Sequence, residues 1–420
     1  MKNVAKKETR NNERKRRMDR AMAMDPALEA RLGMIQALIP LGLSAVNEAL
    51  QREWAAMVGE RYARGKAMGP WGSNRGSVYL LDQKLRVKVP RVRRKDTGEE
   101  VPLASYIRLQ EPGVIEEMAF RRVSNGVSQS NYREAALSIP ETFGISRDSV
   151  SKKWIRASAK KLAELQTRDL SGYDIVAMIL DGKGFGDNEM ITALGVTIEG
   201  EKAMLGFIEA STENFTVCRD FLNDLVKRGL NTDNEILVVM DGGQGLRKGV
   251  RAVLGEKAVI ARCQWHKREN VAEYLNPGAR AEWRRKLQGA YETPTYDEAR
   301  GRLLDLKREL KAINLSAVNS LEEGFEETLT LHRLGMFEKL GVSFKTTNMI
   351  ENVHRLLEDL TGRVCRWRHS EQRQRWVAAG LLKIEPRLRR VRGYEHLPAL
   401  REAMKRLVRR RSEAELQKAA

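Results

Sequence analysis

The chain has 420 residues, which is too long for one ordinary domain and predicts two or three folded units. Its net charge of +19 favours a polyanionic partner, above all nucleic acid, and both ends are basic: residues 1–20 hold 9 Lys/Arg against 3 Asp/Glu, and residues 351–420 hold 18 against 9. Three cysteines without framework spacing exclude a disulfide scaffold, and no apolar run is long enough to span a bilayer, so we expect a cytoplasmic protein without a membrane partner.

The N-terminal sequence predicts a basic arm, then a helix and a small hairpin. Residues 1–24 lack apolar periodicity, which is typical of a flexible arm, whereas residues 26–62 carry apolar side chains at helical spacing. A glycine-rich loop is predicted at residues 65–76. Two short strands follow at residues 78–81 and 85–89, the second with one apolar and one cationic face. This hairpin either lies on DNA or forms a solvated edge.

Residues 113–168 have a helical pattern that contains a candidate helix-turn-helix. Residues 131–138 form its expected first helix, residues 143–145 the turn, and Ser146 the N-cap of the second helix. Such a second helix can enter a major groove, and its candidate DNA contacts are Arg147, Ser149, Lys152, Lys153 and Arg156. An amphipathic helical hairpin without a DNA role has the same pattern. We therefore expect residues 25–170 to be an N-terminal DNA-binding region.

From residue 171 the pattern changes to that of an α/β fold. The expected elements are three strands of an antiparallel meander, a helix, a strand, a second helix and a short strand, at residues 175–180, 191–198, 203–208, 215–228, 236–240, 244–254 and 258–261. A strand reached from the meander through a helix is expected to pair in parallel with one of its members. If that partner is the first strand, Asp181 and Asp241 become neighbours.

Two of these strands are uniformly apolar, and each runs into an Asp-Gly pair, at Asp181 and at Asp241. Such strands belong inside a sheet covered on both faces, and ligands bind outside the strand ends of such sheets. Neighbouring carboxylates repel each other unless a cation neutralises them, and magnesium prefers oxygen ligands. The pattern therefore predicts a magnesium site, with ordinary strand-end turn residues as the alternative.

A third carboxylate follows an all-helical insertion predicted at residues 264–340. The polar residues 345–348 can cap a helix with Glu351 at the edge of its apolar stripe, which consists of Ile350, Val353, Leu357 and Leu360. Glu358 and Asp359 on the same helix are rival candidates, and a solvated Glu351 is the alternative without a function. Three carboxylates suffice to hold two magnesium ions about 4 Å apart for displacement at phosphorus.

Four sequence motifs occur in a specific order: the Asp-Gly pair at 181, MDGGQGLRKGV at 240–250, RCQWHKREN at 262–270 and KTTNMIENVHR at 345–355. With the basic strand and the candidate helix-turn-helix upstream, this order resembles the Mutator-like DDE transposases of bacterial insertion sequences, over most of the chain. The resemblance implies an RNase H-like catalytic core at residues 171–263 and 341–376, interrupted by the helical insertion and followed by a basic helical C-terminal region at residues 377–420.

The resemblance also implies an activity and its residues. The catalytic, metal-binding triad would be Asp181, Asp241 and Glu351, separated by 60 and 110 residues, with Mg²⁺ as the cofactor and Mn²⁺ as a substitute. The substrates would be double-stranded DNA, as terminal inverted repeats and as target, which the enzyme would cleave and join. We expect a nucleoid-associated bacterial protein that forms a homodimer or a larger assembly when two ends are synapsed.

The family's Cys-x-x-His signature falls on Cys263 and His266. It is half of a zinc site, and Cys365 with His369 could supply the other half, but we do not expect zinc. Instead we expect His266 to act beside the carboxylates, with Cys263 packed in the core. Further candidate phosphate contacts are Arg262, Lys267, Arg268, Arg363, Arg366 and Arg368.

Two other functions compete with an active transposase. An RNase H-like nuclease or junction resolvase would cut DNA without joining it, and the long insertion together with the N-terminal DNA-binding region disfavours this function. A catalytically silent DNA-binding protein derived from a transposase is the other, and the presence of all three carboxylates disfavours it.

Overall fold

The computed structural model describes residues 26–59, 67–80, 83–110, 147–362, 364 and 366–419. The chain divides into two compact units, Met1–Ala157 and Ser158–Ala420. The division lies within helix α6 (Arg147–Gln166), N-terminal to the predicted boundary at residue 171. The predicted basic arm, and the first helix and turn of the predicted helix-turn-helix, lie outside the described residues.

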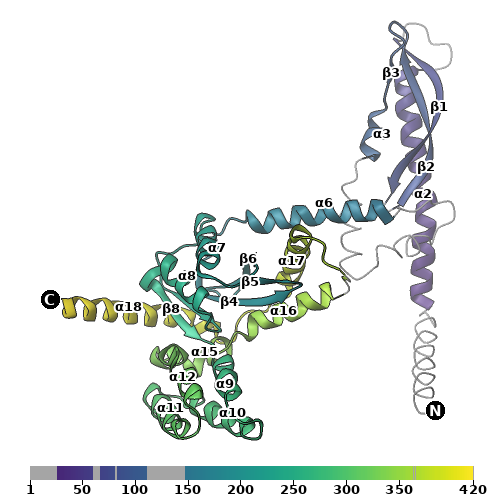
Figure 1. Cartoon of the computed structure of the whole chain (residues 1–420). Helices are drawn as coiled ribbons and strands as arrows, with labels where there is room; N and C mark the ends of the chain where they lie inside the picture. The colour runs from purple at the N-terminus through teal and green to yellow at the C-terminus, as the bar shows by residue number, and fades with distance from the viewer. Residues whose placement is uncertain are drawn as a thin grey trace, which may run out of the picture. The chain divides into compact units, whose positions relative to one another are not determined.

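The first unit contains a three-stranded antiparallel sheet in the order β1 (Met68–Leu80), β2 (Gln83–Arg94) and β3 (Glu100–Val101). A long helix, α2 (Pro26–Val58), and a short one, α3 (Ala104–Leu109), accompany it (Figure 1). Its core includes Val46 and Leu50 from one face of α2. They pack with the alternate residues Leu85, Val87 and Val89 of β2, the predicted apolar face of that strand. The predicted helix and hairpin are therefore present.

The glycine-rich loop predicted at residues 65–76 is wrong, because β1 begins at Met68. A bulge between Pro70 and Ser73 absorbs the irregular sequence, and Gly72 there has a φ of +75°. At Gly76 a Cβ atom would lie 2.6 Å from Val89 Cγ2, so only glycine allows the two strands to meet. The glycines that predicted a loop instead permit a long, closely packed hairpin.

The second unit is built on a five-stranded sheet in the order β6-β5-β4-β7-β8 (Figure 1). Strands β4 (Ile175–Phe185), β5 (Asn188–Thr197) and β6 (Lys202–Ala210) form the predicted antiparallel meander. Strand β7 (Ile236–Met240) pairs in parallel with β4, and β8 (Ala258–Arg262) pairs in parallel with β7. The meander and a parallel pairing with one of its members are thus confirmed, and the partner, which the sequence left open, is the first strand.

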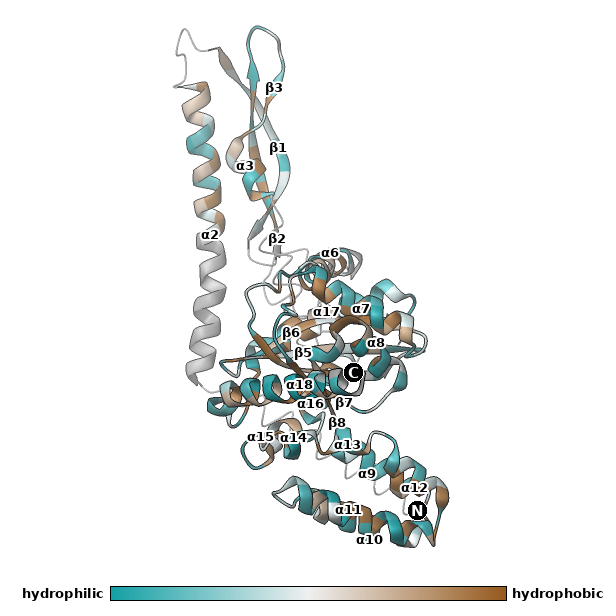
Figure 2. Cartoon of the chain, turned by 90° about the vertical axis from the view of Figure 1, so that its left-hand side faces the viewer, coloured by the Kyte–Doolittle hydropathy of each residue, from teal (hydrophilic) through white to brown (hydrophobic). Residues whose placement is uncertain are grey.

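Helices cover both faces of this sheet, as the uniformly apolar strands predict. One core forms against α7 (Phe215–Lys227) and α8 (Gln244–Leu254). The other forms against α16 (Asn348–Thr361), α17 (Ser370–Ile384) and α18 (Leu397–Ala419). Figure 2 shows hydrophobic strands between helices of mixed character. No helix in the described part of the chain is long and apolar enough to span a membrane.

One strand end differs from the prediction. Strand β4 does not stop at Asp181 but continues to Phe185, so Asp181 lies inside the strand. Gly182 and Gly184 continue the ladder, opposite Ile191 and Glu189 of β5. The Glu189 side chain lies over Gly182, where a Cβ atom would displace its carboxyl group.

The segment between β8 and α16 is helical, as predicted. It consists of α9 (Gln264–Glu273), α10 (Pro277–Tyr291), α11 (Tyr296–Lys311), α12 (Leu315–Glu322), α13 (Phe325–Thr328), α14 (Thr330–Arg333) and α15 (Phe337–Phe344). Its first four helices share a core of their own that includes Trp283, Leu287, Leu303 and Leu310. The insertion thus has an independent core while its two ends return to the sheet.

Candidate active site

Asp181 and Asp241 lie side by side because their strands pair in parallel. The register joins Leu180 to Met240, and each aspartate is the next residue. Asp181 is 6% exposed, whereas Asp241 is partly buried and accepts a hydrogen bond from the Gly243 backbone N–H at 3.1 Å. Burial raises the pKa of Asp181, and the charge of Asp241 adds to the rise. This pair of carboxylates is electrostatically suited to a cation.

A histidine that sequence analysis missed contacts Asp181. His354 lies on α16, is 4% exposed, and holds Nδ1 3.3 Å from Asp181 Oδ2. This contact lowers the pKa of Asp181 against the larger effect of burial. His354 follows Glu351 by three residues, so both side chains lie on neighbouring positions of one helix. The Glu-x-x-His spacing is the signal that could have identified it.

Glu351 is the acidic residue of α16 that faces the site. It accepts a 2.5 Å hydrogen bond from Thr347 Oγ1, and its charge raises the pKa of His266. The rival side chains are each 65% exposed: Glu358 pairs with Lys183 at 2.7 Å and Asp359 with Arg355 at 3.3 Å. The helix therefore turns Glu351 towards the core and its rivals towards solvent.

Cys263 and His266 lie beside Glu351. Cys263 caps α9, with Sγ accepting from the His266 backbone N–H at 3.5 Å, and His266 Nδ1 lies 3.4 Å from Thr347 Oγ1. Burial lowers the pKa of His266, but the contact with Cys263 and the charges of Asp241 and Glu351 outweigh it and raise that pKa to about 9. An imidazolium thus faces the carboxylates.

The donor atoms of Cys263, His266 and Glu351 all lie within 4.8 Å of one another. Among the described residues, His369 is not part of this group: its Nδ1 caps α17, accepting from the Gln372 N–H at 3.1 Å. Cys365 lies outside the described residues. The Thr347 hydroxyl lies within hydrogen-bond distance of all three donors, 3.5 Å from Cys263 Sγ, 3.4 Å from His266 Nδ1 and 2.5 Å from Glu351 Oε1.

Two of the predicted phosphate contacts are buried: Arg262 joins the insertion to the core, and Lys267 joins two helices of the insertion. Arg262 donates to the backbone oxygens of Asp241 (3.2 Å), Gly242 (3.3 Å) and Glu323 (2.9 Å). Lys267 is 0% exposed and donates to the Ser320 carbonyl, and burial lowers its pKa to about 8. Since these cations are satisfied inside the protein, we withdraw them as phosphate contacts.

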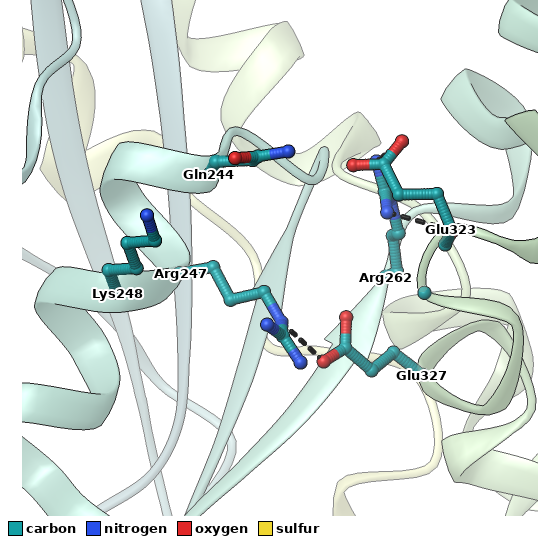
Figure 3. Close-up of a pocket in the computed structure, with 7 residues that line it drawn as sticks. Gln244, Arg247, Lys248, Arg262, Glu323 and Glu327 are labelled. Carbon is teal, nitrogen blue, oxygen red and sulfur yellow. Dashed lines mark hydrogen bonds and ion pairs between the residues drawn. The ribbon is translucent and has the colours of Figure 1, made fainter.

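A cavity of about 260 Å³ lies next to Arg262, between α8 and the insertion (Figure 3). Arg247 and Glu327 face each other across it at 2.6 Å, and Arg262 reaches Glu323 at 3.4 Å. Both cations are therefore neutralised by carboxylates of the insertion. This cavity therefore lies at the junction between the core and the insertion.

The other candidate DNA contacts differ in exposure. Lys152 and Arg156 are exposed on α6, whereas Lys153 is buried with its ammonium 5.1 Å from the ring centre of Tyr79. Arg147 and Ser149 lie in the first turn of α6, and Arg363 lies outside the described residues. Arg268 is partly buried and donates to Gln288 at 2.8 Å. Arg366 and Arg368 are exposed after α16.

A fourth carboxylate near the site also escaped sequence analysis. Glu213, just before α7, accepts from the Leu246 backbone N–H at 3.2 Å. Burial raises its pKa, and the charges of Asp241, Glu189 and Asp181 add to the rise. The negative potential at this edge of the sheet therefore exceeds that of the predicted triad alone, which strengthens the attraction for a cation.

Comparisons with known proteins identify the family of the chain. The chain is 25% identical over 352 residues to the transposase for insertion sequence element IS905 of Lactococcus lactis, covering 80% of this chain and 85% of that protein. It is 26% identical over 275 residues to the transposase for ISRM5 of Rhizobium meliloti, covering 64% and 67%, and 27% identical over 331 residues to the transposase for IS406 of Burkholderia multivorans, covering 75% and 82%. Residues 12–375 match the family described as Transposase, Mutator family. Since this match spans most of the chain, the protein belongs to the Mutator family of transposases.

Proposed function

We propose that this transposase is a DDE enzyme that cleaves and joins DNA with Mg²⁺ held by Asp181, Asp241 and Glu351. The observation that carries the proposal is the parallel pairing of β4 with β7, which sets two carboxylates side by side under the helix that bears the third. Burial and like charge make this site unfavourable for bare carboxylates and favourable for a divalent cation. Mn²⁺ is expected to replace Mg²⁺.

We further propose that the second unit has an RNase H-like core. Three antiparallel strands followed by two parallel ones, with helices on both faces, support this assignment. The insertion between β8 and α16 leaves the sheet at Arg262 and returns with Glu351, so an interruption of the core still delivers the third carboxylate.

The residues of the chain would divide the work. Bound Mg²⁺ would activate the attacking oxygen and stabilise the leaving oxygen at phosphorus. His354 and Thr347 orient the first and third carboxylates through the contacts described above. His266, whose pKa is raised to about 9 by its contact with Cys263 and by the charges of Asp241 and Glu351, can donate a hydrogen bond to a phosphate oxygen in its protonated form. The first nucleophile would be water and the second a 3′ hydroxyl.

The proposed substrates are the element's terminal inverted repeats and a target duplex. The first turn of α6 holds Arg147 and Ser149, where a recognition helix would meet base edges, and the exposed Lys152 and Arg156 would contact phosphates. If Arg147 pairs with a guanine, Arg147→Ala costs about 1 to 3 kcal/mol of specificity, measured as competition between repeat and scrambled duplex. If the repeat and the scrambled duplex compete equally for the wild-type protein, this region does not recognise the repeat.

The test of the function uses full-length protein and a plasmid that carries the element with its flanks. We expect cleavage at both ends in Mg²⁺ or Mn²⁺, none in EDTA, and joined products in a second plasmid. Asp241→Asn should give neither product while still binding DNA. Cleavage without joining would support the nuclease instead, and binding without cleavage would support the silent DNA-binding protein.

A further inference from the structure

We propose that a cavity beside Asp181 binds one unpaired nucleobase of the DNA held at the active site, an inference that rests on the proposed function. The cavity has a volume of about 190 Å³. One wall comes from the β4–β5 hairpin, including Phe185 and Thr192, and the other from α16, including His354. Trp367, from the segment between α16 and α17, completes it.

Two residues that line this cavity each carry a buried polar atom without a hydrogen-bond partner among the described residues: Nε2 of His354 and Oγ1 of Thr192. These residues are 4% and 1% exposed. The contact of Nδ1 with Asp181 fixes the imidazole, and Thr192 is the register partner of Asp181 on β5. A buried polar atom without a partner is costly, so these atoms indicate a ligand that brings its own donors and acceptors.

The cavity also has an aromatic wall. The rings of Phe185 and Trp367 lie 4.8 Å apart between centroids, at an interplanar angle of 45°. The backbone of Gly186 packs closely against Trp367, since a Cβ atom there would lie 3.2 Å from the indole Cδ1. A flat ligand that stacks on an aromatic ring and presents a polar edge fits this combination. A phosphate does not, because the cation of the cavity, Lys183, already pairs with Glu358.

The volume of the cavity limits the size of the ligand. Its volume lies below the range of sites for drug-sized molecules, so it suits one small ring system. Every nucleobase offers a face for stacking and an edge with donors and acceptors, and a base can enter a pocket only after leaving the duplex stack. Because His354 contacts both Asp181 and the cavity, an inserted base would hold its strand next to the carboxylates.

The inference predicts that the full-length protein prefers DNA with an unpaired base. The probes are a short duplex with one unpaired 2-aminopurine and the same duplex fully paired, both in Ca²⁺ so that no strand is cut. We expect about tenfold tighter binding to the unpaired probe, with quenching of the 2-aminopurine by Trp367. This assay needs neither the terminal repeats nor cleavage. The preference for an unpaired base can therefore be absent while the proposed function holds, and it can be present while the proposed function fails.

Matched variants assign the effect to the cavity. Trp367→Ala should abolish both the preference and the quenching, whereas Trp367→Phe should keep most of the preference. Trp265→Ala is the control, because Trp265 is 42% exposed on α9 and does not line the cavity. Thr192→Val keeps the shape of the side chain and should reduce the preference severalfold, which covers the case in which Trp367→Ala does not fold.

Two results would overturn the inference. One is equal affinity of the wild type for the two probes. The other is a preference that survives both Trp367→Ala and Thr192→Val, since the unpaired base would then bind elsewhere or only make the duplex easier to bend.

Discussion

The Thr347 hydroxyl donates a 2.5 Å hydrogen bond to Oε1 of Glu351, one turn further along α16. Thr347 is fully buried, and its hydroxyl oxygen lies 3.5 Å from its other acceptor, Cys263 Sγ, so the nearer carboxylate is the main acceptor of its single hydrogen. The hydroxyl can therefore only accept from His266 Nδ1, 3.4 Å away, which is protonated because its pKa is about 9. The imidazolium of His266 thus donates to the Thr347 hydroxyl, and that hydroxyl donates to the Glu351 carboxylate. This chain of hydrogen bonds orients the third ligand of the proposed metal site.

Substitutions at Thr347 can separate this polar role from packing. Thr347→Val keeps the shape but loses the hydroxyl. We therefore expect half-maximal end cleavage to require about 10- to 100-fold more Mg²⁺, the range typical of lost partners of metal ligands. Thr347→Ser loses a methyl group but keeps the hydroxyl, and should require the same Mg²⁺ concentration as the wild type. Magnesium titrations of cleavage, with thermal melts as a folding check, measure both. A packing role alone would reverse the ranking, with Val tolerated and Ser impaired.

The raised pKa of Asp181 predicts how metal binding depends on pH. Without metal, the contribution of this group to stability is fully present below its ordinary pKa of 3.8 and is lost as pH rises through the raised value. Metal binds the carboxylate form, so the gain in Tm on adding Mn²⁺ should grow with pH up to that value and then level off. His266 remains protonated throughout this range because its pKa is about 9. Scanning calorimetry measures the gain, and a gain that is constant or falls as pH rises would contradict the burial argument.

The buried position of Lys267 predicts that it contributes nothing to phosphate binding. Lys267→Met should leave the slope of log affinity against log salt unchanged, although it should lower stability because the Ser320 carbonyl loses its donor. The exposed Arg366 is the matched comparison, and Arg366→Ala should reduce that slope by about one. Filter binding at several salt concentrations gives both slopes. An equal loss in the two variants would mean that Lys267 leaves its buried site to reach DNA.

Local pattern and connectivity predicted much of the arrangement of the two aspartates. Uniformly apolar strands require cover on both faces, and a strand reached through a helix pairs in parallel with a member of the meander. Which member it pairs with was left open, and the structure shows that it is the strand that carries Asp181. The end of β4 was wrong because glycines usually interrupt strands. Gly182 is nevertheless paired with Ile191 of β5, because the ladder uses backbone donors and acceptors that glycine also carries.

The parts of the site that sequence analysis missed depend on tertiary packing. His354 reaches Asp181 only because α16 docks on the sheet, which no local pattern encodes. Arg262 and Lys267 were chosen for charge and for position beside the Cys-x-x-His signature. They are buried because a segment 53 residues beyond Lys267, around Ser320, folds back onto them. Charge predicts affinity for phosphate only where the side chain stays exposed.

The central claim is that Asp181, Asp241 and Glu351, and not the other acids of α16, hold the catalytic metal. Its most direct test measures Mn²⁺ binding by calorimetry and end cleavage on the same preparations of Glu351→Gln and Glu358→Gln. The account predicts that Glu351→Gln loses cleavage by at least about a hundredfold together with metal affinity, because the ligand charge is gone. Glu358→Gln should keep both, since that side chain is 65% exposed and pairs with Lys183. Equal loss in the two variants, or full metal binding by Glu351→Gln, would contradict the account.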